Sequence, residues 1–213
     1  SGIAFEGFTY PDKFLVASTS YPLENDFDNL SWVNYVADPD EWCVLLRCNN
    51  LWRVLFPTKP EDSDEKVLSN EYIQERLKFL TDQKVDFPID HRTLYNVHQR
   101  VAATYRAGRI FLGGDSAHVN NPLGGMGMNG GIHDAVNLTS KLHDVWHGAD
   151  LSLVDRFERQ RRKVAIETVQ AQALKNRQIP NATDPAERVA FHDDLRAIVK
   201  DPARHKEYVM RSS

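Results

Sequence analysis

The sequence predicts an α+β fold in which an antiparallel sheet comes first and helices follow. Three observations support this prediction. The first hundred residues carry runs rich in β-branched and aromatic residues, bounded by Pro, Asn and Asp. The last third carries apolar residues at helical spacing instead. Between these parts, seven of the 11 glycines fall from Gly113 to Gly131, whereas none lies between Gly7 and Gly108. We therefore divide the chain into residues 1–107 and 108–213.

Four strands are expected in the first region, at residues 14–19, 32–36, 41–48 and 51–57. Asn49 and Asn50 separate the last two, and Asn tolerates the left-handed conformation that a tight hairpin turn requires. The resulting register gives a hairpin with two largely apolar faces, so each face needs a cover. One face carries Cys43, Leu45, Arg47, Trp52, Val54 and Phe56, and the other carries Trp42, Val44, Leu46, Leu51, Arg53 and Leu55.

The remaining elements follow from their end signals and periodicity. A short helix is expected over residues 69–80 with Ser69 or Asn70 as its cap. Residues 91–108 predict one long strand or two, and residues 109–114 (RIFLGG) a short, buried, apolar strand. Three helices come next, the first ending at Gly148 and the third capped by Asp184 with Pro185 at its first position. The apolar stripes of the first two are Ile132, Ala135, Val136, Thr139, Leu142 and Trp146, then Val154, Phe157, Val164, Ala165 and Thr168.

Composition excludes several classes of function. A formal net charge of -4 and the lack of a basic run argue against a nucleic-acid partner. Cys43 and Cys48 are typical of reduced thiols in a cytosolic protein, and we expect no metal site from them. No apolar run reaches the roughly 20 residues of a membrane span, and no export signal is evident at the first residues. We therefore expect a cytoplasmic protein that does not bind a membrane.

The glycine cluster indicates a site for a flat, negatively charged ring. A strand that ends in Gly113-Gly114-Asp115 presents a carboxylate, which only accepts hydrogen bonds and so suits a sugar or polyol hydroxyl. Downstream, the free amides at the start of the next helix favour negative charge by about 0.3 to 2 kcal/mol. Gly124, Gly125 and Gly127 would let a ring lie against the backbone. Reduced flavin, with its ribityl chain, meets these requirements.

The segment YRAGRIFLGGDSAHVNNPLGGMGMNGGIHDAVNLTSKL resembles the second flavin-binding motif of the class A flavoprotein aromatic hydroxylases, the family of para-hydroxybenzoate, phenol and hydroxyphenylpropionate hydroxylases. FEGFTYPDKFLV, YVADPDEWCVLLR and LWRVLFP resemble the family's substrate-domain sheet. The resemblance implies part of a larger α/β FAD-binding fold. It also implies an FAD-dependent monooxygenase that uses NAD(P)H and O2, through a flavin hydroperoxide, to hydroxylate a small phenol-like aromatic substrate.

The resemblance also implies site residues. Asp115 would bind the ribityl chain, and Pro122 would lie beside the ring. No residue is assigned a catalytic role, because the flavin performs the chemistry. Trp42, Trp52, Phe56 and Gln99 are candidates for the substrate pocket, with core packing as the alternative for the three aromatic residues and a sheet-surface position for Gln99. The implied cofactor contacts are Gly114, Asp115, Ala117, Pro122, Gly124, Gly125, Met126, Gly127, Met128 and Asn129.

The sequence departs from the family at its beginning. The family starts with a strand, a G-x-G-x-x-G turn and a helix that hold the ADP half of FAD, and nothing upstream of Gly108 could do so. The family's middle Asp-Gly motif is absent as well. We therefore expect an incomplete FAD site, an inactive isolated chain, and a missing N-terminal half as partner, whose loss would expose apolar surface at residues 109–114. The alternative is a degenerate relative that binds an aromatic ligand or partner without catalysis. The sequence makes no prediction of oligomeric state.

Other motifs have competing interpretations. Gly125 to Gly130 fits the G-x-G-x-x-G pyrophosphate turn, but no strand leads into it directly, and a purely structural loop is a further alternative. HDVWH, at residues 143–147, echoes a zinc motif without a third ligand. GDSAH offers Asp115, Ser116 and His118 as a hydrolase triad, although we expect Ser116 and His118 to satisfy backbone groups. Arg161 and Arg162 are interpreted as a solvated face.

Overall fold

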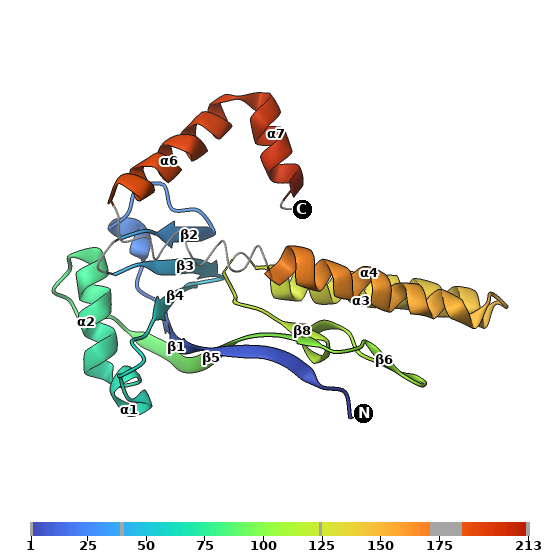
Figure 1. The fold of residues 1–213 in the computed structure, drawn as a ribbon. Helices are drawn as coiled ribbons and strands as arrows, with labels where there is room; N and C mark the ends of the chain where they lie inside the picture. Colours follow the sequence, from blue (N-terminus) through green and yellow to red (C-terminus); the bar gives the residue numbers. More distant parts are fainter. Residues whose placement is uncertain (1, 39–40, 124, 171–184, 212–213) are drawn as a thin grey trace.

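The fold is built on a six-stranded sheet in the order β2-β3-β4-β1-β5-β8, with every adjacent pair antiparallel (Figure 1). The structure is a computed structural model that describes residues 2–38, 41–123, 125–170 and 185–211. A second, two-stranded ladder joins β6 and β7. The strands are β1 (Phe5–Thr19), β2 (Val33–Val36), β3 (Cys43–Cys48), β4 (Leu51–Pro57), β5 (Ile89–Ala102), β6 (Arg106–Ala107), β7 (Ile110–Phe111) and β8 (His118–Val119).

β1 and β5 are the longest strands, with 15 and 14 residues, and they pair along most of their length. A register shift between Thr9 and Lys13 interrupts the ladder where Pro11 has no amide hydrogen to donate. Near the start of β1, Gly7 has φ +136°, and a Cβ there would lie 2.0 Å from the Gln99 carbonyl oxygen. Only glycine fits this close approach, which lets the backbones of β1 and β5 come into contact at Gly7.

The hairpin of β3 and β4 forms in the predicted register, with Arg47 opposite Trp52 and Leu45 opposite Val54. Asn49 in its turn has φ +51°, the left-handed conformation that was expected there. The expectation that each face is covered is confirmed as well. One face contributes to a core with α2, and the other to a core that includes Leu123 of the loop after β8.

The first of these cores lies between the sheet and the helices α1 (Asp64–Val67) and α2 (Asn70–Thr81). Ser69 is the cap of α2, because its hydroxyl oxygen accepts a hydrogen bond from the Tyr72 amide at 3.2 Å. The short 3-10 turn η1 (Leu23–Asn25) closes one end. The buried residues of this core are Leu15, Ala17, Leu23, Cys43, Leu45, Trp52, Val54, Phe56, Val67, Ile73, Leu77 and Phe87.

The helical region begins with η2 (Gly114–Ser116), and α3 (Met126–Trp146) and α4 (Asp155–Val164) then lie side by side as an arm beyond the sheet (Figure 1). A 3-10 turn, η3 (Leu151–Val154), joins the two helices, and a π-helical segment, η4 (Ala165–Gln170), extends α4. Two more helices, α6 (Pro185–Lys200) and α7 (Pro202–Arg211), complete the described chain. Pro185 begins α6 as predicted, whereas Asp184 lies outside the described residues.

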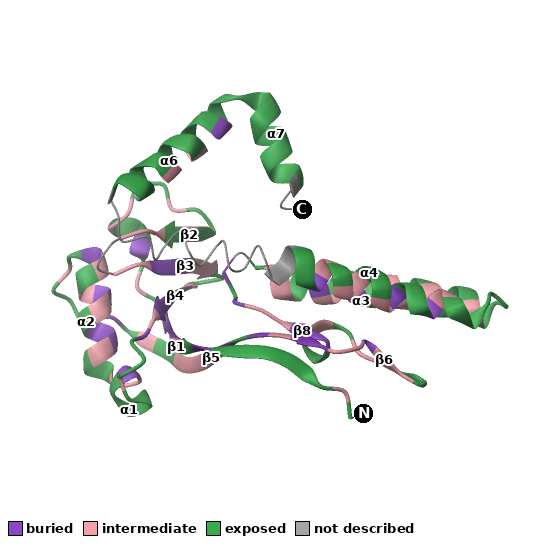
Figure 2. Ribbon diagram, viewed as in Figure 1, coloured by how far each residue is buried: buried purple, intermediate pink, exposed green. Residues whose placement is uncertain are grey.

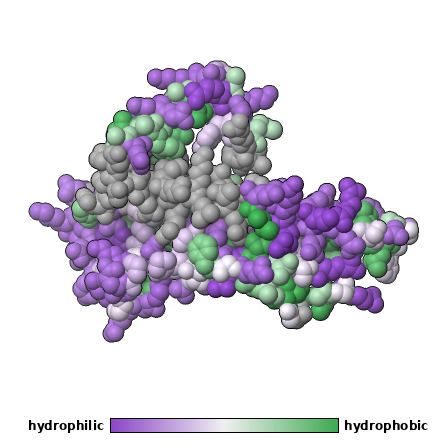
Figure 3. Space-filling model, viewed as in Figure 1, coloured by the Kyte–Doolittle hydropathy of each residue, from purple (hydrophilic) through white to green (hydrophobic). Residues whose placement is uncertain are grey.

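Two apolar segments are exposed in the described chain. The apolar stripe of α3 faces solvent, with Val136 63% and Trp146 87% exposed (Figures 2 and 3). The face turned toward η2 and α4 carries Gly130 and the buried Asp134, whose polar contacts add to the packing of Leu138 against the apolar cluster around Phe157. Residues 109–114 form only the two-residue β7 against β6 rather than a buried strand, and Ile110 is 54% exposed, as expected where no parallel strand flanks these residues in the described chain. The stripe of α4 behaves as predicted, with Val154, Phe157 and Ala165 buried.

In the described part of the chain, we find no helix with the length and apolar character needed to traverse a lipid bilayer.

Candidate functional site

The residues predicted to contact a cofactor fall in two adjoining segments, the turn η2 and the loop that leads into α3. Gly114 has φ +59°, and a Cβ on Gly131 would lie 3.3 Å from the Gly114 Cα. The turn therefore packs backbone to backbone on the second turn of α3. Asp115 follows Gly114 directly in this turn and is exposed to solvent. Ala117 is fully buried, and its carbonyl accepts the Ala102 amide at 2.7 Å, which anchors the turn to β5.

The start of α3 offers backbone donors to a ligand. Gly125 occupies the N-cap position with φ +67°, makes no side-chain cap bond, and precedes a first turn without an acidic residue. The first amides of a helix have no acceptor within it, so they are available to an anionic group here. A Cβ on Gly125 would meet no atom within 4 Å, and Pro122 is exposed on the same loop. Met126, Gly127, Met128 and Asn129 form the first turn, and Gly124 lies outside the described residues.

Gln99 of β5 supports the loop between β8 and α3. This side chain is 2% exposed, and its Oε1 accepts the Asn121 amide at 3.2 Å. The Asn121 Oδ1 in turn accepts the Leu123 amide at 3.0 Å. Within the described residues, the Asn120 Oδ1 and the Asn121 Nδ2 are buried without a hydrogen-bond partner. Gln99 is therefore a support beneath the loop rather than a sheet-surface residue, and the loop retains one unmet acceptor and one unmet donor.

A buried charged cluster joins η2, α3 and α4 around Asp134, a residue that the sequence analysis missed. Its Oδ2 lies 2.8 Å from the His118 Nε2 and accepts the Gly114 amide at 2.9 Å, and its Oδ1 accepts the Arg161 Nε–H at 2.6 Å. Burial raises the pKa of Asp134, but the hydrogen bonds from His118, Arg161 and Gly114 outweigh burial and bring that pKa below its ordinary value. Asp134 is thus a carboxylate at neutral pH. The interpretation of Arg161 and Arg162 as a solvated face was wrong, since Arg162 also donates to the Ala102 carbonyl at 2.9 Å.

The substrate candidates Trp52 and Phe56 lie on the opposite side of the sheet from this loop. Both are buried in the core beneath α2, a placement that favours the core-packing alternative. A different aromatic group occupies the loop side, where Phe14 contacts Trp42 edge-on and stacks on Tyr95. Phe14, Trp42 and the loop residue Asn121 border a small cavity of about 20 Å³.

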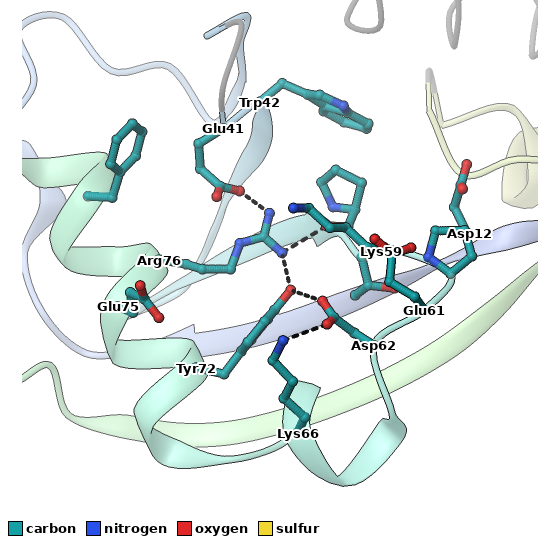
Figure 4. A pocket seen from close by; sticks show the side chains of 14 residues that line it. Asp12, Glu41, Trp42, Lys59, Glu61, Asp62, Lys66, Tyr72, Glu75 and Arg76 are labelled. Atoms are coloured by element: carbon teal, nitrogen blue, oxygen red, sulfur yellow. Dashed lines mark hydrogen bonds and ion pairs between the residues drawn. The ribbon is translucent and has the colours of Figure 1, made fainter.

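A larger, open hollow of about 730 Å³ lies between α2 and the ends of β3 and β4 (Figure 4). Its polar side chains bond mainly to one another. Arg76 pairs with Glu41 and donates to the Pro57 carbonyl at 2.8 Å, while Tyr72 donates to Asp62 at 3.3 Å. Burial lowers the pKa of Arg76 to about 10, and burial followed by the charge of Asp62 raises the pKa of Tyr72 to about 12. We assign no cofactor to this hollow, because Arg76, Glu41, Tyr72 and Asp62 already have partners in one another or in neighbouring groups.

The competing motif interpretations fit the geometry less well. β8, an antiparallel edge strand, precedes the Gly125–Gly130 segment, whereas a pyrophosphate turn follows a parallel strand. In GDSAH, the Ser116 hydroxyl donates to the Gly113 carbonyl at 2.8 Å, while His118 contacts Asp134 rather than Ser116. Ser116 therefore satisfies backbone groups as expected, but His118 does not. In HDVWH, His147 Nδ1 lies 2.8 Å from the His143 carbonyl, and no cluster of three metal-ligating side chains occurs among the described residues.

The FAD binding domain family matches residues 5–172, which include the sheet, the η2 turn and the loop into α3. The chain belongs to the FAD-dependent aromatic hydroxylases. Para-nitrophenol 4-monooxygenase of Pseudomonas sp. (strain WBC-3) is 34% identical over 194 residues, which cover 88% of this chain and 47% of that protein. 6-Hydroxy-3-succinoylpyridine 3-monooxygenase of Pseudomonas putida (strain DSM 28022 / S16) is 33% identical over 209 residues, covering 95% of this chain and 52% of that protein.

Solved structures of this hydroxylase family share the fold. The crystal structure of p-nitrophenol 4-monooxygenase from Pseudomonas putida DLL-E4 superposes with a TM-score of 0.88 at 32% identity, covering 99% of this chain and 55% of the other. A ternary complex of aklavinone-11 hydroxylase with FAD and aklavinone gives a TM-score of 0.74 at 25% identity, over 83% of this chain and 34% of the other. The chain spans about half the length of the curated relatives it matches.

Proposed function

We propose that this chain is the flavin-ring-binding and substrate-binding part of an FAD-dependent monooxygenase that hydroxylates a phenol-like aromatic compound with NAD(P)H and O2. One observation carries the proposal: the turn that holds the exposed Asp115 packs on α3, and the start of α3 has a glycine cap, no side-chain cap bond and no acidic residue in its first turn. A bound flavin would supply the redox chemistry, taking electrons from NAD(P)H and activating oxygen. This chain's residues would supply placement and electrostatics.

Each segment has a distinct part in the proposed site. The Asp115 carboxylate would accept hydrogen bonds from ribityl hydroxyls, since it has no hydrogen to donate as an anion. The amides of Met126, Gly127 and Met128 would stabilise negative charge on the pyrimidine edge of the reduced ring. The absence of a Cβ at Gly125 leaves room for a flat ring to approach the backbone, and Pro122 would border it. Ala117, Gly114 and Asn129 would shape the same surface.

We place the aromatic substrate on the loop side of the sheet, near Phe14, Trp42 and Tyr95, rather than at Trp52 and Phe56. Phe14 contacts both of the other rings, and Phe14 and Trp42 border the small cavity together with Asn121, whose amide Gln99 binds. The cavity of about 20 Å³ is smaller than an aromatic ring, so substrate binding there requires the loop or the Trp42 side chain to move. Two relatives are named for reactions of a nitrophenol and of a hydroxypyridine, and these names are consistent with a phenol-like substrate.

The proposal is tested by comparing riboflavin with lumiflavin, which has a methyl group in place of the ribityl chain. We expect the chain to bind riboflavin about tenfold more tightly than lumiflavin in equilibrium dialysis at pH 7, because a hydrogen bond to a charged group contributes roughly 1.5 to 3 kcal/mol. Replacing Asp115 with Ala should weaken riboflavin binding by about tenfold and leave lumiflavin binding within about twofold.

Asp28→Ala is the matched control, because Asp28 is exposed, lies far along the chain and loses the same charge. It should change neither affinity. Equal affinity of the wild-type chain for the two flavins, or an unchanged riboflavin affinity in Asp115→Ala, would contradict the proposed contact. FAD should bind no more than about threefold more tightly than riboflavin, since no segment of this chain is proposed to hold the adenine half.

A further inference from the structure

The residue before Asp115 is bound by a second carboxylate, because the Gly114 amide donates to the side chain of Asp134 on α3. Asp115 is exposed, whereas Asp134 on α3 is 1% exposed and contacts three different segments of the chain. Those contacts are the Gly114 amide in η2 at 2.9 Å, His118 in β8 at 2.8 Å and Arg161 in α4 at 2.6 Å. Asp134, on α3, therefore links the η2 turn, which contains Asp115, to α3 and through Arg161 to α4.

The backbone around Gly114 leaves little freedom once Asp134 holds its amide. Gly114 has φ +59°, a left-handed conformation that directs the next residue away from the path of β7. The turn is in close contact with α3, because a Cβ on Gly131 would lie 3.3 Å from the Gly114 Cα and one on Gly130 would lie 3.0 Å from the His118 Cε1. Asp115 thus belongs to a turn that α3 holds in two ways, through the hydrogen bond from the Gly114 amide to Asp134 and through the close backbone contact with Gly131.

The two oxygens of Asp134 act on different partners. Oδ1 faces Arg161, which also donates to the Gly130 carbonyl at 3.3 Å, and Oδ2 serves Gly114 and His118 together. An amide in place of the carboxylate has one acceptor oxygen and one donor nitrogen, so it can serve only one of these two sets. The partly buried guanidinium of Arg161 would also lose its counter-charge, which leaves the second set of contacts weakened whichever way the amide is oriented.

We propose that Asp134 is a positioning residue of the flavin site, which sets the place of the Asp115 carboxylate relative to the start of α3. The inference rests on the proposed function, because it concerns the ribityl contact of Asp115. It adds a residue that makes no contact with the flavin and acts through the Gly114 amide. Arg161 and His118 hold Asp134 in turn.

The test uses the ratio of the lumiflavin to the riboflavin dissociation constant, which reports the ribityl contact alone. We expect this ratio to fall from about 10 in the wild-type chain to about 3 or less in Asp134→Asn, with the lumiflavin affinity within about twofold of wild type. A merely structural role would lower both affinities together or neither. Asp144→Asn, an exposed site on the same helix, is the matched control and should leave the ratio unchanged.

Arg161→Gln is the second variant in case Asp134→Asn does not fold, as judged by circular dichroism. It removes the charge that faces Oδ1 but leaves both partners of Oδ2, so we expect the ratio to fall in the same direction by a smaller factor. A wild-type ratio in either folded variant would overturn the role of Asp134. A ratio near 1 in the wild-type chain would overturn the Asp115 contact itself, and the inference with it, so the two failures are distinguishable.

Discussion

Gly7 shows how much of the site depends on one residue far from it in sequence. A Cβ at this position would overlap the Gln99 carbonyl oxygen and lie 2.8 Å from the Arg100 Cα. These are backbone atoms, so the clash is relieved only if β1 or β5 shifts. Gln99 also supports the loop through Asn121, and a displaced β5 would carry that support with it.

We expect Gly7→Ala to lower the free energy of unfolding by about 2 to 4 kcal/mol, from overpacking and from its positive φ together. Chemical denaturation followed by circular dichroism measures this loss. Gly108→Ala is the control, since Gly108 has φ +60° and no atom within 4 Å of an added Cβ. It should cost only the conformational strain, roughly 1 kcal/mol. Equal losses in the two variants would show that β5 accommodates the methyl group.

Local signals explain which residues the sequence could predict. The cap of α2 at Ser69 and the turn at Asn49 follow from backbone chemistry within a few residues, and both are confirmed. Asp134 was missed and Arg161 was misinterpreted because the two residues lie 27 positions apart in sequence, and only the pairing of α3 with α4 brings them together. One signal was present, since Asp134 follows Gly130 by one turn on the side of α3 opposite its apolar stripe.

At the scale of elements, the contact between η2, α3 and α4 combines the buried carboxylate of Asp134 with the apolar cluster around Phe157, and its electrostatic part should depend on pH. The pKa of Asp134 is lower in the folded chain than in the unfolded chain, where it is about 3.9. Such a group contributes stability that is present above the unfolded value and is lost as the pH falls through the folded value. The stabilising contribution is therefore complete at pH 7 and disappears in acid.

We expect the difference in unfolding free energy between the wild-type chain and Asp134→Asn to be about 3 kcal/mol at pH 7 and to shrink below about pH 4. Denaturant titrations at a series of pH values measure it. Asp144→Asn should show no comparable difference, because that side chain is exposed. A difference that stays constant from neutral pH into acid would mean that the charge of Asp134 does not hold these elements together.

Helix α3 also shows that the spacing of apolar residues predicts a helix without predicting which face of it is buried. The sequence correctly predicts a helix with an apolar stripe, but a stripe is buried only where another element covers it. Here Gly130, Gly131 and Asp134 form the packed face, since close backbone approach and a buried ion pair hold η2 and α4 against it. Ile132, Val136 and Trp146 remain exposed in the described chain. That an N-terminal FAD-binding half is missing and would cover residues 109–114 stays a prediction, as does a boundary at residues 107 and 108.

At the scale of the whole molecule, the sheet separates two regions with different chemistry. Beneath α2 lies the main apolar core, bordered by the hollow where Glu41, Arg76, Tyr72 and Asp62 bond to one another (Figure 4). On the other side, the loop after β8 leaves the Asn120 Oδ1 and the Asn121 Nδ2 without partners among the described residues, and the start of α3 has no side-chain cap bond. The sequence predicted this loop from its glycines, but it could not predict which face of the hairpin the loop covers, because that depends on the long pairing of β1 with β5.

The central claim is that a flavin binds between the η2 turn and the start of α3, and mapping backbone amide shifts in the ¹⁵N-labelled chain during a riboflavin titration tests it most directly. We predict that the largest changes in chemical shift occur at Gly114, Asp115 and residues 125–129, with small changes elsewhere. Saturable changes centred on Glu41, Tyr72 and Arg76, or no saturable change near Asp115 at millimolar riboflavin, would contradict the claim.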